Sequence, residues 1–253
     1  MNIVVPVKLV PDLVEELILN DQGTGLDPMW LRYKLNEHDD HAIEEAIVLK
    51  ERLGADVTVI APEMDGTDDV LFTASAKGAD HLIKLCGEFE QNPSNHSLAT
   101  ALVPIVQELG ADLVLTGVQA HNDLDGPLGA LLAGLLGLPY NGYVTAVAID
   151  QGKASLRKEY PGGLIAELVV SLPAVLGIQA AERPLSYIAF SRIRQAMKTA
   201  SLDERDVAQI TPAEIPPSKM FKPESGKRAT MLEGDVDSVA ARMVDIFQEL
   251  GVL

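Results

Sequence analysis

Hydrophobic and polar residues follow one another in blocks along the first 140 residues, and these blocks predict alternating strands and helices. Short apolar runs are typical of buried strands, whereas apolar residues that recur every three or four positions indicate amphipathic helices. We therefore expect strands at 2–10, 56–61, 81–85 and 112–116. Helices are expected at 36–54, 65–76, 95–109 and 128–137. This alternation predicts a parallel sheet with helices on both faces.

The stretch from Ala111 to Leu138 joins a buried strand, a polar loop and an apolar helix. Its loop, residues 117–129, holds three glycines and a proline. A helix N-terminus offers free backbone N–H groups and a partial positive charge, and glycine lets a ligand approach the backbone closely. The layout therefore suits a nucleotide phosphate. It is also the layout of an ordinary strand-to-helix connection. The spacing alone does not favour a phosphate site, since it matches neither the G-x-G-x-x-G motif nor the P-loop motif.

The pattern changes after Pro139. Three β-rich runs are separated by Asp-Gln-Gly and Pro-Gly-Gly turns, which predicts an antiparallel meander. The runs are 143–149, 154–160 and 166–171.

The remaining residues predict a strand, a helix and an arm. The strand is expected at 173–179, and a basic segment follows that should become helical at 191–200. Residues 203–233 carry four of the 15 prolines and many charges, which predicts an extended arm. The last expected helix, 235–250, is amphipathic. Its apolar face consists of Val239, Met243, Ile246 and Phe247.

Composition narrows the classes of function. The 253 residues are 47% hydrophobic, which is enough for a sizeable core. The net charge of −17 repels nucleic-acid phosphates and anionic lipids, so we expect neither as a partner. The single cysteine, Cys86, excludes an intramolecular disulfide and fits a reducing compartment. With no signal-peptide pattern and no apolar run long enough to span a membrane, we expect a cytoplasmic protein without direct membrane insertion.

The sequence contains no motif for covalent or metal catalysis. The nucleophile-elbow, P-loop, zinc-protease and paired-cysteine patterns are absent. His38 and His41 lie among carboxylates, but an acidic first helical turn explains this cluster through the helix dipole. Asp123 and Asp125 are more typical of capping or solvated acids than of an acid–base pair. We therefore assign no catalytic residue and no metal, and expect a protein that binds a cofactor rather than an enzyme.

Several stretches, in order along nearly the whole chain, resemble the β subunit of electron-transfer flavoproteins. The most specific are the Thr-Gly-x-Gln-Ala loop and the Gly-Gly-x-x-x-Glu block that runs into Leu-Pro-Ala-Val. The resembling stretches are VPVKLVPD (5–12), NEHDDHAIEEAIVLKE (36–51), AKGAD (76–80), 111–139, KEYPGGLIAELVVSLPAV (158–175) and AERPLSYIAFSRIRQAMK (181–198). The resemblance implies an α/β fold over 1–200, a Rossmann-like sheet of the adenine-nucleotide α-hydrolase type with a short meander. The arm and its helix would occupy 201–253.

The resemblance also implies a heterodimer that carries electrons between a dehydrogenase and a downstream acceptor. The α subunit would hold a redox-active FAD, and the β subunit would help hold it and bind AMP, or a second FAD in flavin-bifurcating members. The nucleotide contacts carried over by position are Pro6, Asn36, Glu37, His38, Asp39, Pro62, Gly117, Val118, Gln119, Ala120, His121, Asn122, Asp123, Leu124, Asp125, Gly126, Pro127 and Leu128. The chain departs from the family at APEMDG (61–66) and at Pro127, which lacks an N–H for a phosphate. The choice between AMP and a second FAD therefore stays open.

A loop after Leu-Pro-Ala-Val carries, in the resembled family, a leucine that docks on dehydrogenases. Ile188 takes that place here, with Phe190 as its substitute if the register shifts. The alternative is that Ile188 packs beneath the helix at 191–200.

A second class of function is a stand-alone adenine-nucleotide sensor of the universal-stress-protein type. Such a sensor should end after its last parallel strand, whereas this chain adds a meander, a basic segment and an arm. The electron carrier is therefore favoured. A nucleotide hydrolase lacks a candidate base.

Overall fold

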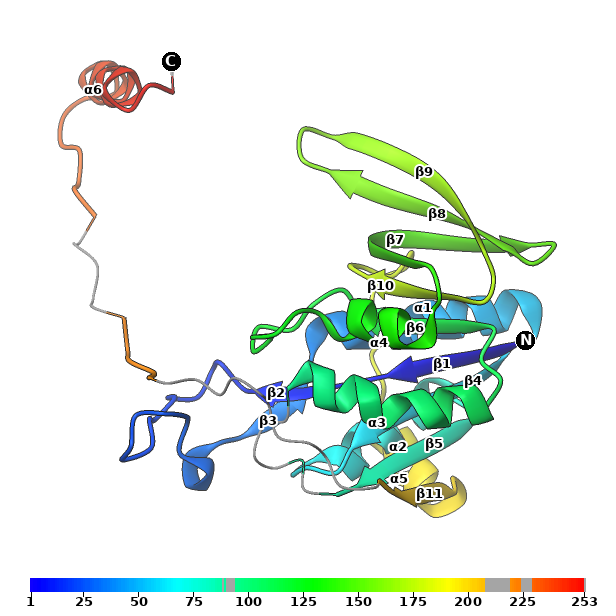
Figure 1. Cartoon of the computed structure of the whole chain (residues 1–253). Helices are drawn as coiled ribbons and strands as arrows, with labels where there is room; N and C mark the ends of the chain where they lie inside the picture. Colours follow the sequence, from blue (N-terminus) through cyan, green and yellow to red (C-terminus); the bar gives the residue numbers. More distant parts are fainter. Residues whose placement is uncertain (88, 90–93, 208–218, 224–228, 253) are drawn as a thin grey trace.

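The computed structural model describes residues 1–87, 89, 94–207, 219–223 and 229–252. In this part of the chain, nine strands form one mixed sheet with helices on both faces (Figure 1). In spatial order they are β11 (Leu202–Asp206), β5 (His81–Cys86), β4 (Asp56–Pro62), β1 (Asn2–Pro6), β6 (Leu113–Gly117), β10 (Ala174–Ile178), β7 (Tyr140–Asp150), β8 (Lys153–Tyr160) and β9 (Leu164–Ser171). Neighbours from β11 to β7 are parallel, and β7, β8 and β9 are antiparallel. The predicted fold class and meander are confirmed.

Two hydrophobic cores lie on the two faces of the sheet. One is covered by α1 (Glu37–Leu53) and α2 (Thr67–Lys77), and the other by α3 (Asn95–Glu108) and α4 (Leu128–Leu136). Because successive side chains of a strand point to opposite faces, β1 sends Ile3 and Val5 into the first core and Val4 into the second. A strand buried on both faces has to be apolar at every position, which is why the predicted strands are continuous apolar runs.

The order in which successive strands are added to the sheet reverses at β1. The chain builds β4 and β5 on one side of this strand and then returns to place β6 on the other side. Such a reversal leaves a crevice outside the carboxyl ends of the two central strands, where open α/β sheets bind their ligands. Lys8 follows β1 at this edge, and the 117–128 loop follows β6.

A bulge interrupts the pairing of β7 with β10. Asn141 pairs with Leu176 and Val144 pairs with Ile178, so two residues of β7, Gly142 and Tyr143, lie opposite one residue of β10. The extra residue bends the strand at its beginning. From there the chain enters the β8–β9 hairpin, which projects beyond the helices (Figure 1).

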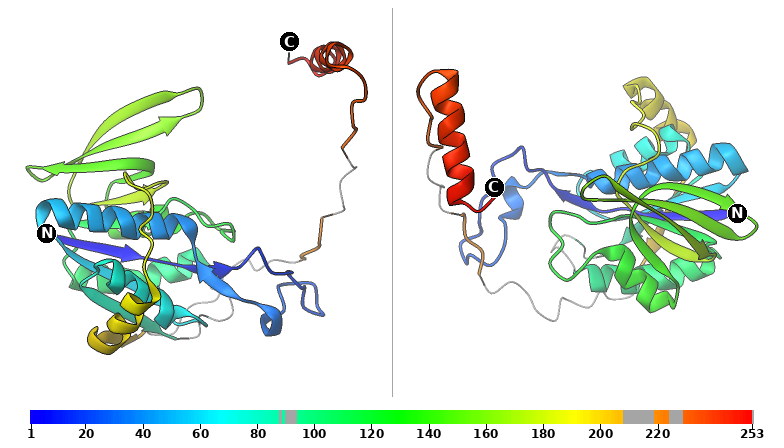
Figure 2. Two further views of the ribbon diagram at one scale, coloured as in Figure 1. Left: turned by 180° about the vertical axis from the view of Figure 1, so that it is seen from behind. Right: turned by 90° about the horizontal axis from the view of Figure 1, so that it is seen from above.

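The end of the chain differs from the expected arm. The helix α5 (Phe190–Thr199) confirms the one expected at 191–200, and the chain then enters β11, which lies parallel to β5 at the edge of the sheet. The sheet therefore continues to Asp206, inside the range expected for the arm. The last helix, α6 (Val236–Glu249), stands apart from the body of the protein in both views of Figure 2, and none of its residues is buried.

Residues 12–32 form a long loop. It joins two strands that pair antiparallel, β2 (Leu9–Pro11) and β3 (Tyr33–Leu35), and it contains a bridge between Leu19 and Leu26. Among the helices of the described residues, not one combines the length and the apolar character needed to cross a bilayer.

Candidate functional site

One buried carboxylate ties the start of α1 to the ends of β1 and β6. Asp39 is 3% exposed and accepts the N–H groups of Lys8 at 2.8 Å and Gly117 at 2.7 Å. A Cβ on Gly117 would lie 2.5 Å from Asp39 Oδ1 and 2.8 Å from the Asp39 backbone nitrogen, so this contact requires glycine. Burial raises the pKa of Asp39 to about 6, although the two N–H groups act in the opposite direction. Asp39 therefore serves the fold with both carboxylate oxygens.

The raised pKa of Asp39 makes a testable contribution to stability. The carboxyl titrates near 3.8 when unfolded and near 6 when folded, so its burial costs nothing below pH 3.8 and the full amount above pH 6. At ~1.36 kcal/mol per pH unit, this amount is about 3 kcal/mol. We expect the free energy of unfolding, compared with Asp39→Asn, to fall by about 2–3 kcal/mol from roughly pH 4 to pH 7. Urea unfolding at both pH values measures this, and a difference that rises with pH would contradict it.

The two acids of the 117–128 loop hold the loop to its neighbours. Asp123 accepts from Lys8 Nζ at 2.7 Å and from Asn95 Nδ2 at 2.6 Å. Asp125 accepts two backbone N–H groups in the first turn of α3, at 3.0 and 2.9 Å, and so caps that helix. Asp125 therefore caps a helix, as the capping interpretation predicted, whereas Asp123 forms an ion pair with Lys8.

A cavity of about 630 Å³ opens between the 117–128 loop and the start of β7. Seven predicted contacts line it: Val118, Gln119, Ala120, Asp123, Leu124, Gly126 and Pro127. Five lining residues were not predicted: Tyr140, Asn141, Gly142, Tyr143 and Lys158. The other predicted contacts do not line it: Pro6, Asn36, Glu37, His38, Asp39, Pro62, Gly117, His121, Asn122, Asp125 and Leu128. The volume lies within the ~300–1,000 Å³ typical of small-molecule pockets.

Several predicted contacts outside the cavity serve the fold. Asn36 stands at the N-cap position of α1, but its side chain does not cap the helix. Its amide donates to Gln119 O at 3.0 Å instead and so holds the 117–128 loop. His38 Nδ1 lies 3.0 Å from a backbone carbonyl of the segment after β10. Pro6 and Pro62 are the last residues of β1 and β4.

Tyr140 occupies a space that three glycines leave open beside the cavity. A Cβ on Gly142 or Gly177 would lie 2.8 or 2.6 Å from the Tyr140 hydroxyl, and one on Gly129 would lie 3.1 Å from its ring. Burial raises the pKa of Tyr140 to about 12, so its phenol stays neutral at physiological pH. Its neighbour in the bulge, Tyr143, is half exposed with φ 60, a backbone conformation that strains a residue other than glycine. Such strain is concentrated at binding sites.

The lining suits an anionic ligand with an aromatic ring. Lys158 supplies a cation, while the carboxylate of Asp123 in the same lining is already paired with Lys8. Gln119 and Asn141 supply amides that can both donate and accept hydrogen bonds. Tyr143 supplies an aromatic surface. Gly126 has φ 105 and nothing within 4 Å of where a Cβ would stand, so a ligand can approach the backbone there. A nucleotide combines the charge, polarity and ring that these groups would bind.

The two residues predicted for partner recognition differ in exposure. Ile188 is half-buried, whereas Phe190, at the first position of α5, is 62% exposed. Arg194 lies 4.7 Å from the centre of the Phe190 ring, and Tyr187 is 92% exposed. The structure therefore presents aromatic rings and a cation on this surface, with Ile188 partly withdrawn.

The two histidines of α1 contact the chain that crosses the helix. His41 Nδ1 accepts the N–H of Ala181 at 3.2 Å. Within the described ranges, no group of three or more His, Cys, Asp or Glu side chains is arranged to hold a metal ion.

Comparison with known proteins adds independent findings. The family model described as electron transfer flavoprotein domain matches residues 31–210. An electron transfer flavoprotein subunit beta of Methylophilus methylotrophus is 30% identical and covers 98% of each chain. A probable subunit beta of Saccharomyces cerevisiae is 29% identical over 84% of this chain and 82% of its own. A subunit beta of Syntrophomonas wolfei is 31% identical over 73% of this chain and 75% of its own.

Proposed function

This chain belongs to the electron transfer flavoprotein family as a β subunit, and from that premise we propose that it binds a nucleotide in the cavity beside the 117–128 loop. Subunits of this kind pair with an α subunit and are electron carriers rather than enzymes. In the heterodimer, this chain helps to hold the FAD of the α subunit while electrons pass from a dehydrogenase to a downstream acceptor. The observation that carries the proposal is the cavity, which joins the predicted loop to a cation and an aromatic rim.

The nucleotide is AMP or a second FAD. Lys158 would hold its phosphate, Tyr143 would pack against a ring, and Gln119 and Asn141 would bond its polar edges. A flavin supplies redox chemistry when bound and AMP supplies none, so the identity of the nucleotide decides whether this subunit holds a redox centre of its own. Denaturing the purified heterodimer and separating the released nucleotide by chromatography identifies it.

Substitution of Gly126 tests the place of the nucleotide. Gly126→Val would add bulk at the open backbone and strain a residue at φ 105, so we expect the nucleotide bound per heterodimer to fall at least about tenfold. Gly162→Val is the matched control, because Gly162 also has positive φ, 82, and open space, but lies in the turn of the β8–β9 hairpin. Normal nucleotide content in Gly126→Val would contradict the assignment of the loop.

Docking on the dehydrogenase would centre on Phe190 rather than Ile188. Phe190 is the more exposed of the two, and Arg194 beside it can attract an acidic partner. We expect Phe190→Ala to raise the dehydrogenase concentration that half-saturates flavin reduction about 5- to 150-fold, the effect of a hot spot worth ~1–3 kcal/mol. Ile188→Ala should instead lower the melting temperature. If Ile188→Ala instead raised the half-saturating concentration and Phe190→Ala lowered the melting temperature, Ile188 would be the residue that docks on the dehydrogenase.

The terminal helix α6 would bind the α subunit. No residue of α6 is buried within the described part of this chain, and its side chains Val236, Met243, Val244 and Phe247 are exposed. A helix of this length is marginal alone in water and needs a surface to pack against. The known partner of a β subunit supplies that surface.

A further inference from the structure

The segment between β10 and α5, residues 179–189, runs across the outside of α1, and we call it the strap. In the view from behind, Figure 2 shows it in yellow as it crosses the helix. It contains no helix or strand of its own. Side chains of α1 contact it at intervals of three or four residues, which places them on one face of the helix. His38 and His41 are the first two of these contacts.

Glu45 is the next contact and joins the strap to the sheet. Its side chain is fully buried. One carboxylate oxygen accepts the N–H of Glu182 in the strap at 2.9 Å, and the other accepts the N–H of Val147 in β7 at 3.0 Å. Burial raises the pKa of Glu45, and these two N–H groups act against that rise.

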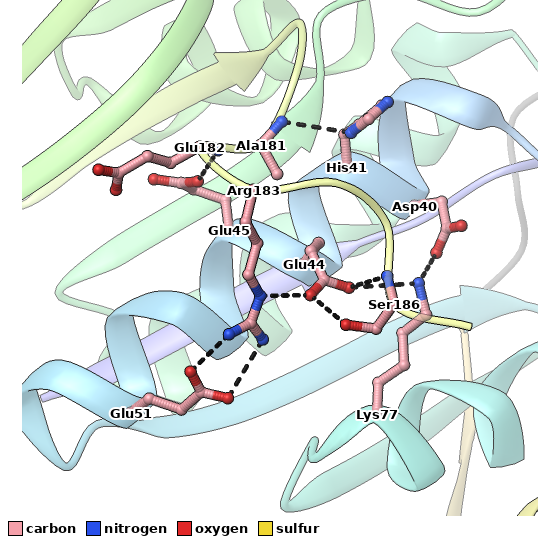
Figure 3. Close-up of polar contacts among 10 residues, drawn as sticks. All are labelled: Asp40, His41, Glu44, Glu45, Glu51, Lys77, Ala181, Glu182, Arg183 and Ser186. Carbon is pink, nitrogen blue, oxygen red and sulfur yellow. Dashed lines mark hydrogen bonds and ion pairs between the residues drawn. The ribbon is translucent and has the colours of Figure 1, made fainter. Parts of the chain in front are cut away.

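Glu44 holds the strap through both of its oxygens, as Figure 3 shows. Oε1 accepts from Arg183 Nε and from Ser186 Oγ, both at 2.7 Å. Oε2 accepts the N–H of Ser186 at 3.1 Å and lies 3.7 Å from Lys77 Nζ. Glu44 is 1% exposed. Burial raises its pKa, but the hydrogen bonds from Ser186 and Arg183 outweigh burial and keep the pKa below its ordinary value.

Glu44 is the last of these anchors before the exposed end of the strap. Ser186, which it holds by two donors, is followed at once by Tyr187 and four residues later by Phe190. An aromatic side chain on an unanchored loop would sample many positions, and ordering that loop on binding would weaken the complex. Because the strap is already held at Ser186, most of the entropic cost of ordering it is met before the partner binds.

We propose that Glu44 is a positioning residue for partner docking, which holds the strap at Ser186 so that Tyr187 and Phe190 project in one arrangement. This inference rests on the proposed docking of a dehydrogenase at Phe190. Glu44 itself would touch neither the partner nor the flavin.

The test compares Glu44→Gln with Glu51→Gln in the purified heterodimer. Glutamine keeps the size of Glu44 but turns an N–H group toward groups that donate. Glu51 is the matched control, because it bonds the same Arg183 guanidinium from the exposed side of α1, where an ion pair contributes little. Two quantities are measured: hydrogen exchange of the Ser186 amide, and flavin reduction over a range of concentrations of a dehydrogenase that reduces the wild type.

For Glu44→Gln we expect Ser186 exchange to be at least about tenfold faster and the half-saturating dehydrogenase concentration to rise about tenfold. The limiting rate and reduction by dithionite, which needs no docking, should not change. Glu51→Gln should behave as the wild type. Faster exchange without a change in half-saturation would overturn the inference, and so would unchanged exchange. If Glu44→Gln fails to fold, Ser186→Ala decides, since it removes one donor from an exposed position and should raise half-saturation about threefold.

Phe190→Ala, measured beside these variants, separates the two proposals. If it raises half-saturation and Glu44→Gln does not, only the positioning role of Glu44 fails. If neither raises it, the docking surface itself is wrong.

Discussion

Removing residues 235–253 should abolish stable association with the α subunit and leave the folded β core unchanged. Several apolar side chains of α6 are exposed in this chain, and none of its residues is buried. Burial of four exposed apolar side chains, Val236, Met243 and Phe247 of α6 and Leu250 directly after it, would contribute several kcal/mol at ~1.5–3 kcal/mol each. We therefore expect the dissociation constant of the heterodimer to rise more than about 100-fold, which corresponds to ~2.7 kcal/mol.

Titration calorimetry of the two subunits measures the constant, and thermal unfolding of the truncated β subunit supplies the control. Its melting temperature should stay within about 2 °C of the full chain, because a shift of that size corresponds to less than ~1 kcal/mol. The point variant Phe247→Ser should weaken assembly, whereas its neighbour on the polar face, Gln248→Ser, should not. Full-strength assembly without α6 would contradict the prediction, and a large fall in melting temperature would show that α6 packs on its own core.

The place of this truncation comes from the structure rather than from the sequence. A cut after Ala200 follows from the expected arm, but it would remove β11, which pairs with β5. The residues of β11 are LDERD, and most of their side chains are exposed. An edge strand held by backbone hydrogen bonds needs no apolar face, so it leaves no hydrophobic pattern to detect.

The strands at the centre of the sheet were predictable for the opposite reason. Both faces of β1, β4 and β6 are covered, so their sequences are continuous apolar runs between turn residues. The loop after β6 was also predictable, since its glycines and acids stand between a strand and a helix. What it contacts was not, because Lys8 and Asn95 reach it from distant positions in the chain.

The wall of the cavity opposite the 117–128 loop shows a second limit of prediction from the sequence. Tyr140, Asn141 and Lys158 have sequence neighbours that are typical of ordinary strands, and only the fold brings them beside the 117–128 loop. One signal was available: Gly142 interrupts a strand, which often marks a bulge or a close approach of backbone. The strap left a signal too, since Glu45 follows Ala42 by three residues and so shares the buried face of α1.

Gly117→Ala should destabilise the fold more than any other addition of a single methyl group near the site. Its Cβ would lie 2.8 Å from two backbone atoms of α1, the Asp39 nitrogen and the His38 carbonyl carbon, and neither can rotate away as a side chain can. The helix and the strand would have to separate. Their separation would also lengthen the hydrogen bond from the Gly117 N–H to Asp39, which leaves a buried carboxylate short of a donor.

We expect Gly117→Ala to lower the free energy of unfolding by about 2–6 kcal/mol, from overpacking of ~1–3 kcal/mol and a weakened buried hydrogen bond of ~1–3 kcal/mol. At ~2–4 °C per kcal/mol, the melting temperature should fall by about 10 °C. The control is Gly134→Ala in α4, where a Cβ meets nothing within 4 Å and φ is not positive. Alanine favours a helix by ~0.5–1 kcal/mol, so the control should gain stability. If Gly117→Ala melts with the wild type, then α1 and β6 do not meet at Asp39, and the base of the proposed nucleotide site is built differently.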